Sequence, residues 1–119
     1  MQIAILDTNA LLMPFESHLN IDLELTRLLG QCEIYIPGCV IGELRRSKSK
    51  HARAALTLAR KYPIVETQKQ GDEGVIEAAR QLSGFVVTND ALLRSRLRKL
   101  GLKTIFLRSN HHLEIDGDY

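Results

Sequence analysis

The sequence has no long apolar run. Its longest uncharged apolar stretch, IYIPGCVIG at residues 34–42, is far shorter than the roughly 20 residues that a helix needs to cross a bilayer. The first residues also lack the basic segment and apolar core of a secretory leader, because Met1 and Gln2 lead directly into a strand-like run that ends at Asp7. We therefore expect a cytoplasmic protein without a membrane partner.

Cysteine and aromatic residues are scarce. The two cysteines, Cys32 and Cys39, lie seven positions apart, which fits neither a C-x-x-C redox pair nor a paired-thiolate zinc site. We expect both to be small buried hydrophobic residues. The chain has no tryptophan and only three Phe and three Tyr, none interleaved with its basic clusters. Without such stacking platforms, recognition of a nucleic acid would depend on backbone charge and shape.

The remaining composition is that of one globular domain with an uneven charge distribution. A chain of 119 residues, 45% hydrophobic and 25% charged, can bury a single core. The formal net charge of +2 hides two basic clusters, which the acids of the last residues offset. The clusters consist of Arg45, Arg46, Lys48, Lys50 and Arg53, and of Arg94, Arg96, Arg98, Lys99 and Lys103.

Short aliphatic runs alternate with helical patterns along the chain. The strand-like runs are residues 3–6, 33–36, 64–65, 85–88 and 103–107, and helical patterns cover 21–29, two segments within 39–62, 72–82 and 91–100. Because each connection holds a helix, we expect a five-stranded parallel sheet and no antiparallel hairpin. The apolar periodicity stops after residue 108, so we expect one domain at 1–108 and a loosely held polar tail at 109–119.

Four carboxylates are positioned to meet at one edge of this sheet. Asp7 and Asp90 follow the first and fourth strands, Asp72 heads the helix after the third, and Glu43 lies about two turns into the helix after the second. In open α/β sheets, ligands bind outside the carboxyl ends of the strands, where the strand order reverses. If the first and fourth strands are neighbours there, Asp7 and Asp90 face one crevice.

Each acid also has an interpretation that needs no ligand. Asp7, Asp72 and Asp90 precede helices and could serve as N-caps. Glu43 could form a surface ion pair with Arg46 at i+3, and the basic runs could be solvated helix faces. The combination is more informative than any member, because four gathered carboxylates repel one another unless a cation neutralises them.

Oxygen ligands of this kind favour Mg²⁺ or Mn²⁺ over zinc. Such ions activate water and stabilise the oxygens of a displacement at phosphorus, and a basic rim around them suits a polyanion whose flanking phosphates it would bind. We therefore expect Arg45, Arg46, Lys48, Lys50, Arg94, Arg96 and Arg98 to contact the phosphates of this polyanion.

The residues resemble the PIN domain family. The segments that carry the resemblance are AILDTNALL, IYIPGCVIGELRR and the stretch from GDEGVIEAARQL to TNDALLRSRLRKLGLKTIFLR, which together cover about residues 2–108. The resemblance implies an α/β/α sandwich with strand order 3-2-1-4-5, and a Mg²⁺- or Mn²⁺-dependent endoribonuclease that leaves 5′-phosphate and 3′-hydroxyl ends. It assigns the catalytic and metal-binding acids to Asp7, Glu43, Asp72 and Asp90, with supporting polar groups at Thr8, Asn9 and Thr88.

The same motifs look closer to the PIN nucleases of ribosomal RNA processing than to VapC-type toxins of toxin–antitoxin pairs. We expect a role in rRNA processing or RNA quality control, a protein partner that sets substrate choice, and, by analogy with the family, a homodimer. Two alternatives stay open: a toxin, or a non-catalytic RNA-binding or assembly module with the same fold. A phosphatase or receiver domain ranks last, because these need an Asp-x-Asp or a double-acid cluster with a late strand-end Lys, and LDTNA supplies neither.

The last residues hold a second group of potential ligands. His111 and His112 are followed by Glu114, Asp116 and Asp118. This group could form an accessory metal site, although a solvated polar tail is the simpler interpretation.

Overall fold

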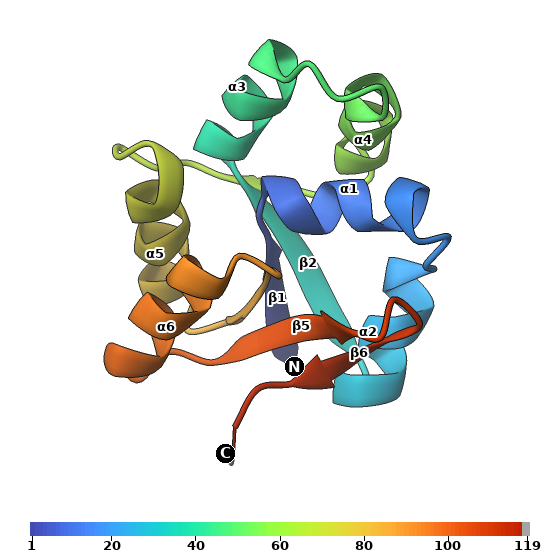
Figure 1. The fold of residues 1–119 in the computed structure, drawn as a ribbon. Coiled ribbons are helices and arrows are strands. Elements are labelled where there is room, and N and C mark those ends of the chain that lie inside the picture. The colour runs from blue at the N-terminus through green and yellow to red at the C-terminus, as the bar shows by residue number, and fades with distance from the viewer. Residues whose placement is uncertain (118–119) are drawn as a thin grey trace.

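The computed structural model of the chain describes residues 1–117. These residues form one six-stranded sheet with the strand order β3-β2-β1-β4-β5-β6 (Figure 1). The strands are β1 (Gln2–Leu6), β2 (Cys32–Pro37), β3 (Ile64–Val65), β4 (Phe85–Val87), β5 (Thr104–Arg108) and β6 (His112–Ile115). The helices are α1 (Thr8–Glu16), α2 (Ile21–Leu29), α3 (Gly38–Arg46), α4 (Ala52–Ala59), α5 (Gly71–Leu82) and α6 (Ala91–Lys99).

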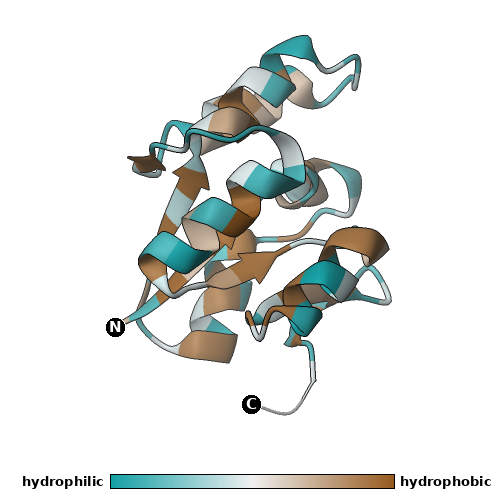
Figure 2. Cartoon of the chain, turned by 90° about the vertical axis from the view of Figure 1, so that its left-hand side faces the viewer, coloured by the Kyte–Doolittle hydropathy of each residue, from teal (hydrophilic) through white to brown (hydrophobic). Residues whose placement is uncertain are grey.

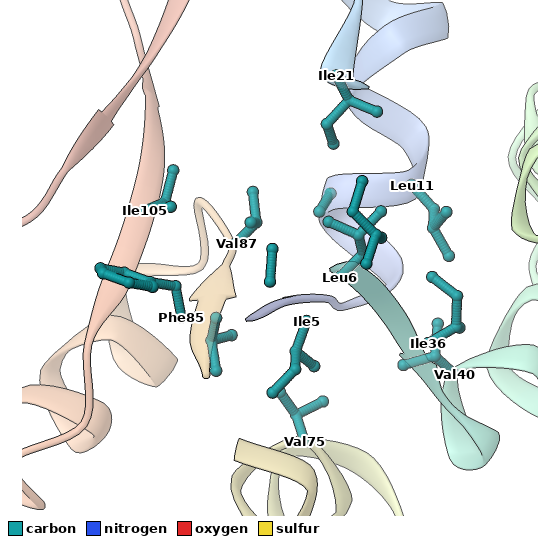
Figure 3. Packing of buried hydrophobic residues seen from close by; sticks show 14 of the residues in the cluster. Ile5, Leu6, Leu11, Ile21, Ile36, Val40, Val75, Phe85, Val87 and Ile105 are labelled. Carbon is teal, nitrogen blue, oxygen red and sulfur yellow. The ribbon is translucent and has the colours of Figure 1, made fainter. Parts of the chain in front are cut away.

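The predicted α/β architecture and the order 3-2-1-4-5 are confirmed, because β1 to β5 pair in parallel in that order. Two helices lie on each side of the sheet: α5 and α6 on one, α1 and α2 on the other (Figure 1). The alternating side chains of β1 reach both layers. Ile5 points toward Val75 of α5, whereas Leu6 points to the opposite side, where α1 carries Leu11 (Figure 3).

The exclusion of an antiparallel hairpin was wrong. Strand β6 pairs antiparallel with β5, with Leu107 opposite Leu113. The expectation of a loosely held tail is therefore also wrong for residues 112–115, since Leu113 is fully buried and its N–H donates to Glu24 of α2 (2.8 Å). The pattern of one apolar residue between His112 and Glu114 is too short to show a strand period in the sequence.

The structure also tests the expectations for the cysteines and for a membrane span. Both thiols are free; Cys39 is buried, and Cys32 only partly so. Within residues 1–117, no helix combines the length and the apolarity that a bilayer crossing demands. The brown, hydrophobic ribbon lies mainly in the strands and the inward sides of the helices, and the outward sides are teal (Figure 2).

The strand register determines which side chains meet at the carboxyl edge of the sheet. Leu6 of β1 lies opposite Val87 of β4, so the next residues along the chain, Asp7 and Thr88, leave the sheet side by side. This is the point where the strand order reverses, since β2 follows β1 on one side and β4 on the other. The helices α3 and α4 stand beyond the same edge (Figure 1).

Candidate active site

Asp7 is a buried carboxylate at the end of β1. Its side chain is 6% exposed, and its Oδ1 atom accepts a hydrogen bond from the Ala10 N–H (2.8 Å), which makes it the N-cap of α1. Burial raises the pKa of Asp7 to about 7, although the hydrogen bonds from Thr88 and Ala10 lower it, and the charges of Asp90 and Asp72 raise it further. A cation bound beside this carboxyl group would favour its ionised form.

Thr88 connects Asp7 with Asp90. Its side chain is fully buried, its hydroxyl hydrogen-bonds to the Asp7 carboxyl, and its Oγ1 atom accepts from the Asp90 N–H (3.1 Å). Asp90 itself is exposed and caps α6 by accepting from the Leu93 N–H (3.0 Å). The capping interpretation is thus correct for both Asp7 and Asp90, and capping leaves one oxygen of each carboxylate outside the cap.

Asn9 and Asn89 brace the turns that carry these two acids. The Asn9 Oδ1 atom accepts from the Asn89 N–H (2.8 Å), and the Asn89 amide exchanges two bonds with the Leu107 backbone, at 2.6 Å and 3.3 Å. The contacts hold the ends of β1, β4 and β5 in one arrangement. The resemblance assigns a supporting role to Asn9 and not to Asn89, although Asn89 is also a polar residue next to one of the four acids.

Glu43 joins this region through α3. Its Oε2 atom accepts a hydrogen bond from the Thr8 hydroxyl (2.7 Å), which links the first turn of α1 to the middle of α3. The alternative ion pair with Arg46 does not form among the described residues. The structure thus places Glu43 beside Thr8, the residue that follows Asp7.

Asp72 approaches from the first turn of α5 without capping it. The N-cap position of α5 is Gln70, so the capping interpretation of Asp72 is wrong. Burial raises the pKa of the Asp72 carboxyl, and the charges of Asp90 and Glu43 add to the rise while Arg96 opposes it. Asp72 therefore interacts electrostatically with each of the other three acids, Asp7, Asp90 and Glu43.

Electrostatic range is longer than ligand distance. Charges interact over about 10 Å at ordinary salt, whereas Mg²⁺ binds its oxygens at about 2 Å. Within residues 1–117, no three His, Cys, Asp or Glu side chains form a group that could hold a metal ion. The donor set fits a hard divalent cation, because it consists of carboxylates. To bind one ion, however, the carboxylates would have to move closer together than they are in this structure. The exposed Asp90 and the half-buried Asp72 have more freedom to move than the buried Asp7.

The predicted RNA-binding residues fall into two kinds. In α6, Arg94 and Arg98 pair with Asp116 at 3.2 Å and 2.8 Å, and Arg96 pairs with Glu73 of α5. The exposed cations Arg45, Arg46, Lys48 and Lys50 form no ion pair within the described chain.

Within residues 1–117, the C-terminal histidines and acids form neither a metal group nor a solvated tail. Glu114 contacts His112 and Arg108, both at 3.1 Å, and Asp116 binds the arginines of α6. His111 is exposed. Asp118 lies outside the described residues.

Three comparisons relate the chain to known proteins. The family profile described as "PIN like domain" matches residues 4–110. The chain is 29% identical over 120 residues to Ribonuclease VapC9 of Archaeoglobus fulgidus, covering 95% of this chain and 88% of that protein. It is 30% identical over 123 residues to Ribonuclease VapC4 of Methanocaldococcus jannaschii, covering 93% and 94%. The solved structure of the PIN domain endonuclease Utp24 superposes with a TM-score of 0.83 at 22% identity, covering 96% and 90%, which shows a shared fold.

Proposed function

The chain belongs to the PIN-like domain family, and from this premise we propose that it is a metal-dependent endoribonuclease that hydrolyses RNA phosphodiester bonds to 5′-phosphate and 3′-hydroxyl ends. The names of its relatives support the reaction class, since both VapC9 and VapC4 are ribonucleases and each aligns over more than nine-tenths of this chain. The identity of the residues that act, and of the metal, is our inference from the site.

The observation that carries the proposal is the position of Asp7. A carboxylate that is almost fully buried, with a pKa of about 7 and two further acids acting on it, is unfavourable to ionise alone. A divalent cation would remove that penalty. The hydrogen bonds from Thr88 and Ala10 restrict the orientation of the carboxylate.

Asp7 and Asp90, with Glu43, Asp72 or both, would hold Mg²⁺ or Mn²⁺. When bound, the ion would neutralise charge on the scissile phosphate and lower the pKa of a water molecule for attack on phosphorus. The chain contributes orientation: Thr88 positions Asp7 and the Asp90 backbone, and Thr8 positions Glu43. Basic side chains around the site would bind the flanking phosphates.

Two cellular roles remain in competition. The sequence motifs favour rRNA processing or RNA quality control, with a protein partner that selects the substrate and with a homodimer as the expected assembly. The VapC name of both relatives favours the toxin of a toxin–antitoxin pair instead, in which case the partner would be an inhibitor. The catalytic proposal is the same in both roles.

Cleavage of a labelled RNA in Mg²⁺ or Mn²⁺, with EDTA as the blank, tests the proposal. We expect cleavage by the wild type and none by Asp7→Asn or Asp90→Asn, both of which can keep the N-cap because Asn caps as well as Asp. Glu16→Gln is the matched control, since Glu16 is exposed on α1 and has no partner among the described residues. RNA binding without any metal-dependent product would favour a non-catalytic module, and undiminished cleavage by Asp7→Asn would refute the site.

A further inference from the structure

The two basic clusters, which look alike in the sequence, use their charges differently in the folded chain. The arginines of the α6 cluster form ion pairs with other residues of the protein. Arg94 and Arg98 share the Asp116 carboxylate, which is 12% exposed and also accepts from the Thr104 hydroxyl (3.2 Å). The guanidinium of Arg94 lies over the Phe106 ring at 4.1 Å from its centroid.

The third arginine of this helix also has a partner within the protein. Arg96 forms an ion pair with Glu73, which connects α6 to the first turn of α5. The pKa of Glu73 is held below its ordinary value by this partner. A phosphate that approached Arg94, Arg96 or Arg98 would have to displace a carboxylate from each, so their field toward RNA is largely cancelled.

The cluster between α3 and α4 has no such partners. Arg46, Lys48, Lys50 and Arg53 are exposed and form no ion pair within residues 1–117. The upper end of the molecule in Figure 2, where α3 ends, is correspondingly hydrophilic. When unpaired cations neutralise phosphates, the counterions condensed on the nucleic acid are released, and this release supplies much of the affinity.

The loop that carries the lysines has a defined conformation. In the segment Ser47–Lys48–Ser49–Lys50, the Ser47 Oγ atom accepts from the Ser49 N–H and the Ser49 Oγ atom accepts from the His51 N–H, each at 3.1 Å. The serines are partly buried and the lysines exposed, so the alternation points both charges outward. A backbone that is already ordered loses less entropy on binding.

The loop also lies next to the candidate active site. Glu43, bonded to Thr8, is in the middle of α3, and the helix ends at Arg46, three residues or about 5 Å of helix rise further on, where the loop begins. That distance is within the reach of a charge at ordinary salt. No equivalent free cation lies on the described part of α6, apart from Lys99 at its last residue.

We propose that the RNA backbone is held by the α3–α4 cations Arg46, Lys48, Lys50 and Arg53, and that the arginines of α6 position the C-terminal hairpin and α5 instead. The substrate then crosses the site from the α3 side. This inference rests on the proposed ribonuclease function and assigns the binding surface that the function requires.

A comparison of two double variants with equal loss of charge tests the proposal. Lys48→Gln with Lys50→Gln removes two free cations, and Arg96→Gln with Arg98→Gln removes two paired ones. The readouts are the affinity for a fluorescent single-stranded oligoribonucleotide in EDTA over a series of KCl concentrations, the thermal midpoint, and kcat/KM in Mg²⁺. EDTA keeps the RNA intact during the binding measurement.

For the lysine pair, we expect the slope of log K against log salt to fall by about 1.4, which is about 0.7 for each lost phosphate contact on a single strand, and the affinity to drop roughly tenfold. Its thermal midpoint should stay at the wild-type value. For the arginine pair, we expect an unchanged slope and a lower thermal midpoint, because Asp116 and Glu73 lose partners.

Equal losses of slope in the two variants would overturn the proposal. So would an unchanged slope in the lysine variant, which would assign the loop to another partner, such as an acidic protein segment. Wild-type protein that binds RNA without cleaving it would refute the ribonuclease function, and the comparison of slopes would still decide which surface binds.

Discussion

At the scale of single residues, the site depends on Asp7, whose position favours its role as a cap but disfavours its ionisation. The carboxylate is needed as a cap for α1 and is buried beside other acids, so its ionisation is costly. Thr88 reduces the cost by donating to it. Residues that stabilise a fold are seldom left with such a penalty, which is why we connect this one with a cation.

The cost of ionising Asp7 makes the free energy of unfolding depend on pH, and Asp7→Asn should remove this dependence. The folded chain keeps the Asp7 proton up to a pKa of about 7, whereas the unfolded chain loses it near 3.8, so the free energy of unfolding should fall as the pH rises between these values and stay lower above them. The full difference is on the order of 4 kcal/mol by the factor of 1.36 kcal/mol per pKa unit. Urea unfolding of both proteins in EDTA across this range measures it, and parallel curves would contradict the assignment.

Thr88 offers a second test at this scale. Thr88→Val keeps the shape but removes the donor to Asp7 and the acceptor for the Asp90 N–H, which should cost about 1–3 kcal/mol and raise the pKa of Asp7 further. Thr88→Ser retains the hydroxyl and should recover most of the stability and the cleavage rate. If the Val variant unfolded at the wild-type urea concentration and cut RNA normally, Thr88 would have no positioning role.

At the scale of elements, the approach of α5 to α3 determines how near Asp72 comes to Glu43. Gly74 of α5 faces Cys39 of α3 so closely that a Cβ atom there would overlap the Cys39 Sγ atom and lie 2.6 Å from the Lys69 carbonyl oxygen. A backbone oxygen cannot move aside as a flexible side chain can. The glycine therefore permits the contact between the two helices that carry Glu43 and Asp72.

We expect Gly74→Ala to push α5 outward, with a loss of about 1–3 kcal/mol of stability from overpacking and reduced cleavage because Asp72 retreats. Gly42→Ala is the control inside α3, where the added Cβ meets only the mobile end of Arg46 at 3.3 Å. It should be neutral or stabilising by up to about 1 kcal/mol through helix propensity. Thermal unfolding and cleavage rates distinguish the two, and a stable, active Gly74→Ala protein would contradict the packing argument.

Elements differed in how far the sequence could predict them. Long runs with a clear period, such as Ile21–Leu29, and aliphatic runs that end in a polar tip, such as the one before Asp7, were predictable because their signals are local. Strand β6 was not, since four residues carry little period and its pairing with β5 depends on contacts with α2. The partners of the α6 arginines were hidden for the same reason: Asp116 is distant in sequence and meets them only in the folded chain.

At the scale of the whole molecule, the C-terminal hairpin closes one side of the sheet and holds α2 and α6 to it. Glu24 and Arg27 of α2 bind the backbone of Leu113, and Asp116 binds two arginines of α6. Burial raises the pKa of Asp116, but the hydrogen bond from Arg98 and the charge of Arg94 outweigh this and hold the pKa below its ordinary value. The stability that this carboxylate contributes is therefore present above its unfolded pKa and lost as the pH falls.

Asp116→Asn should lower the stability at neutral pH by about 1–3 kcal/mol, because it removes a partly buried charge from two arginines. The difference from the wild type should shrink on acidification. Hydrogen exchange should show faster opening of β6 and α6 than of β1. Equal protection in the variant and the wild type would mean that the hairpin is held by its apolar contacts alone.

The same scale holds the central claim, that acids from β1, α3, α5 and α6 converge on one divalent ion. Anomalous scattering from crystals grown with Mn²⁺ tests it most directly. We predict a peak bonded to Asp7 and Asp90, with Glu43 or Asp72 drawn in from its present position, and no peak at this place in Asp7→Asn crystals. A fully occupied manganese peak elsewhere, with none beside Asp7, would contradict the account.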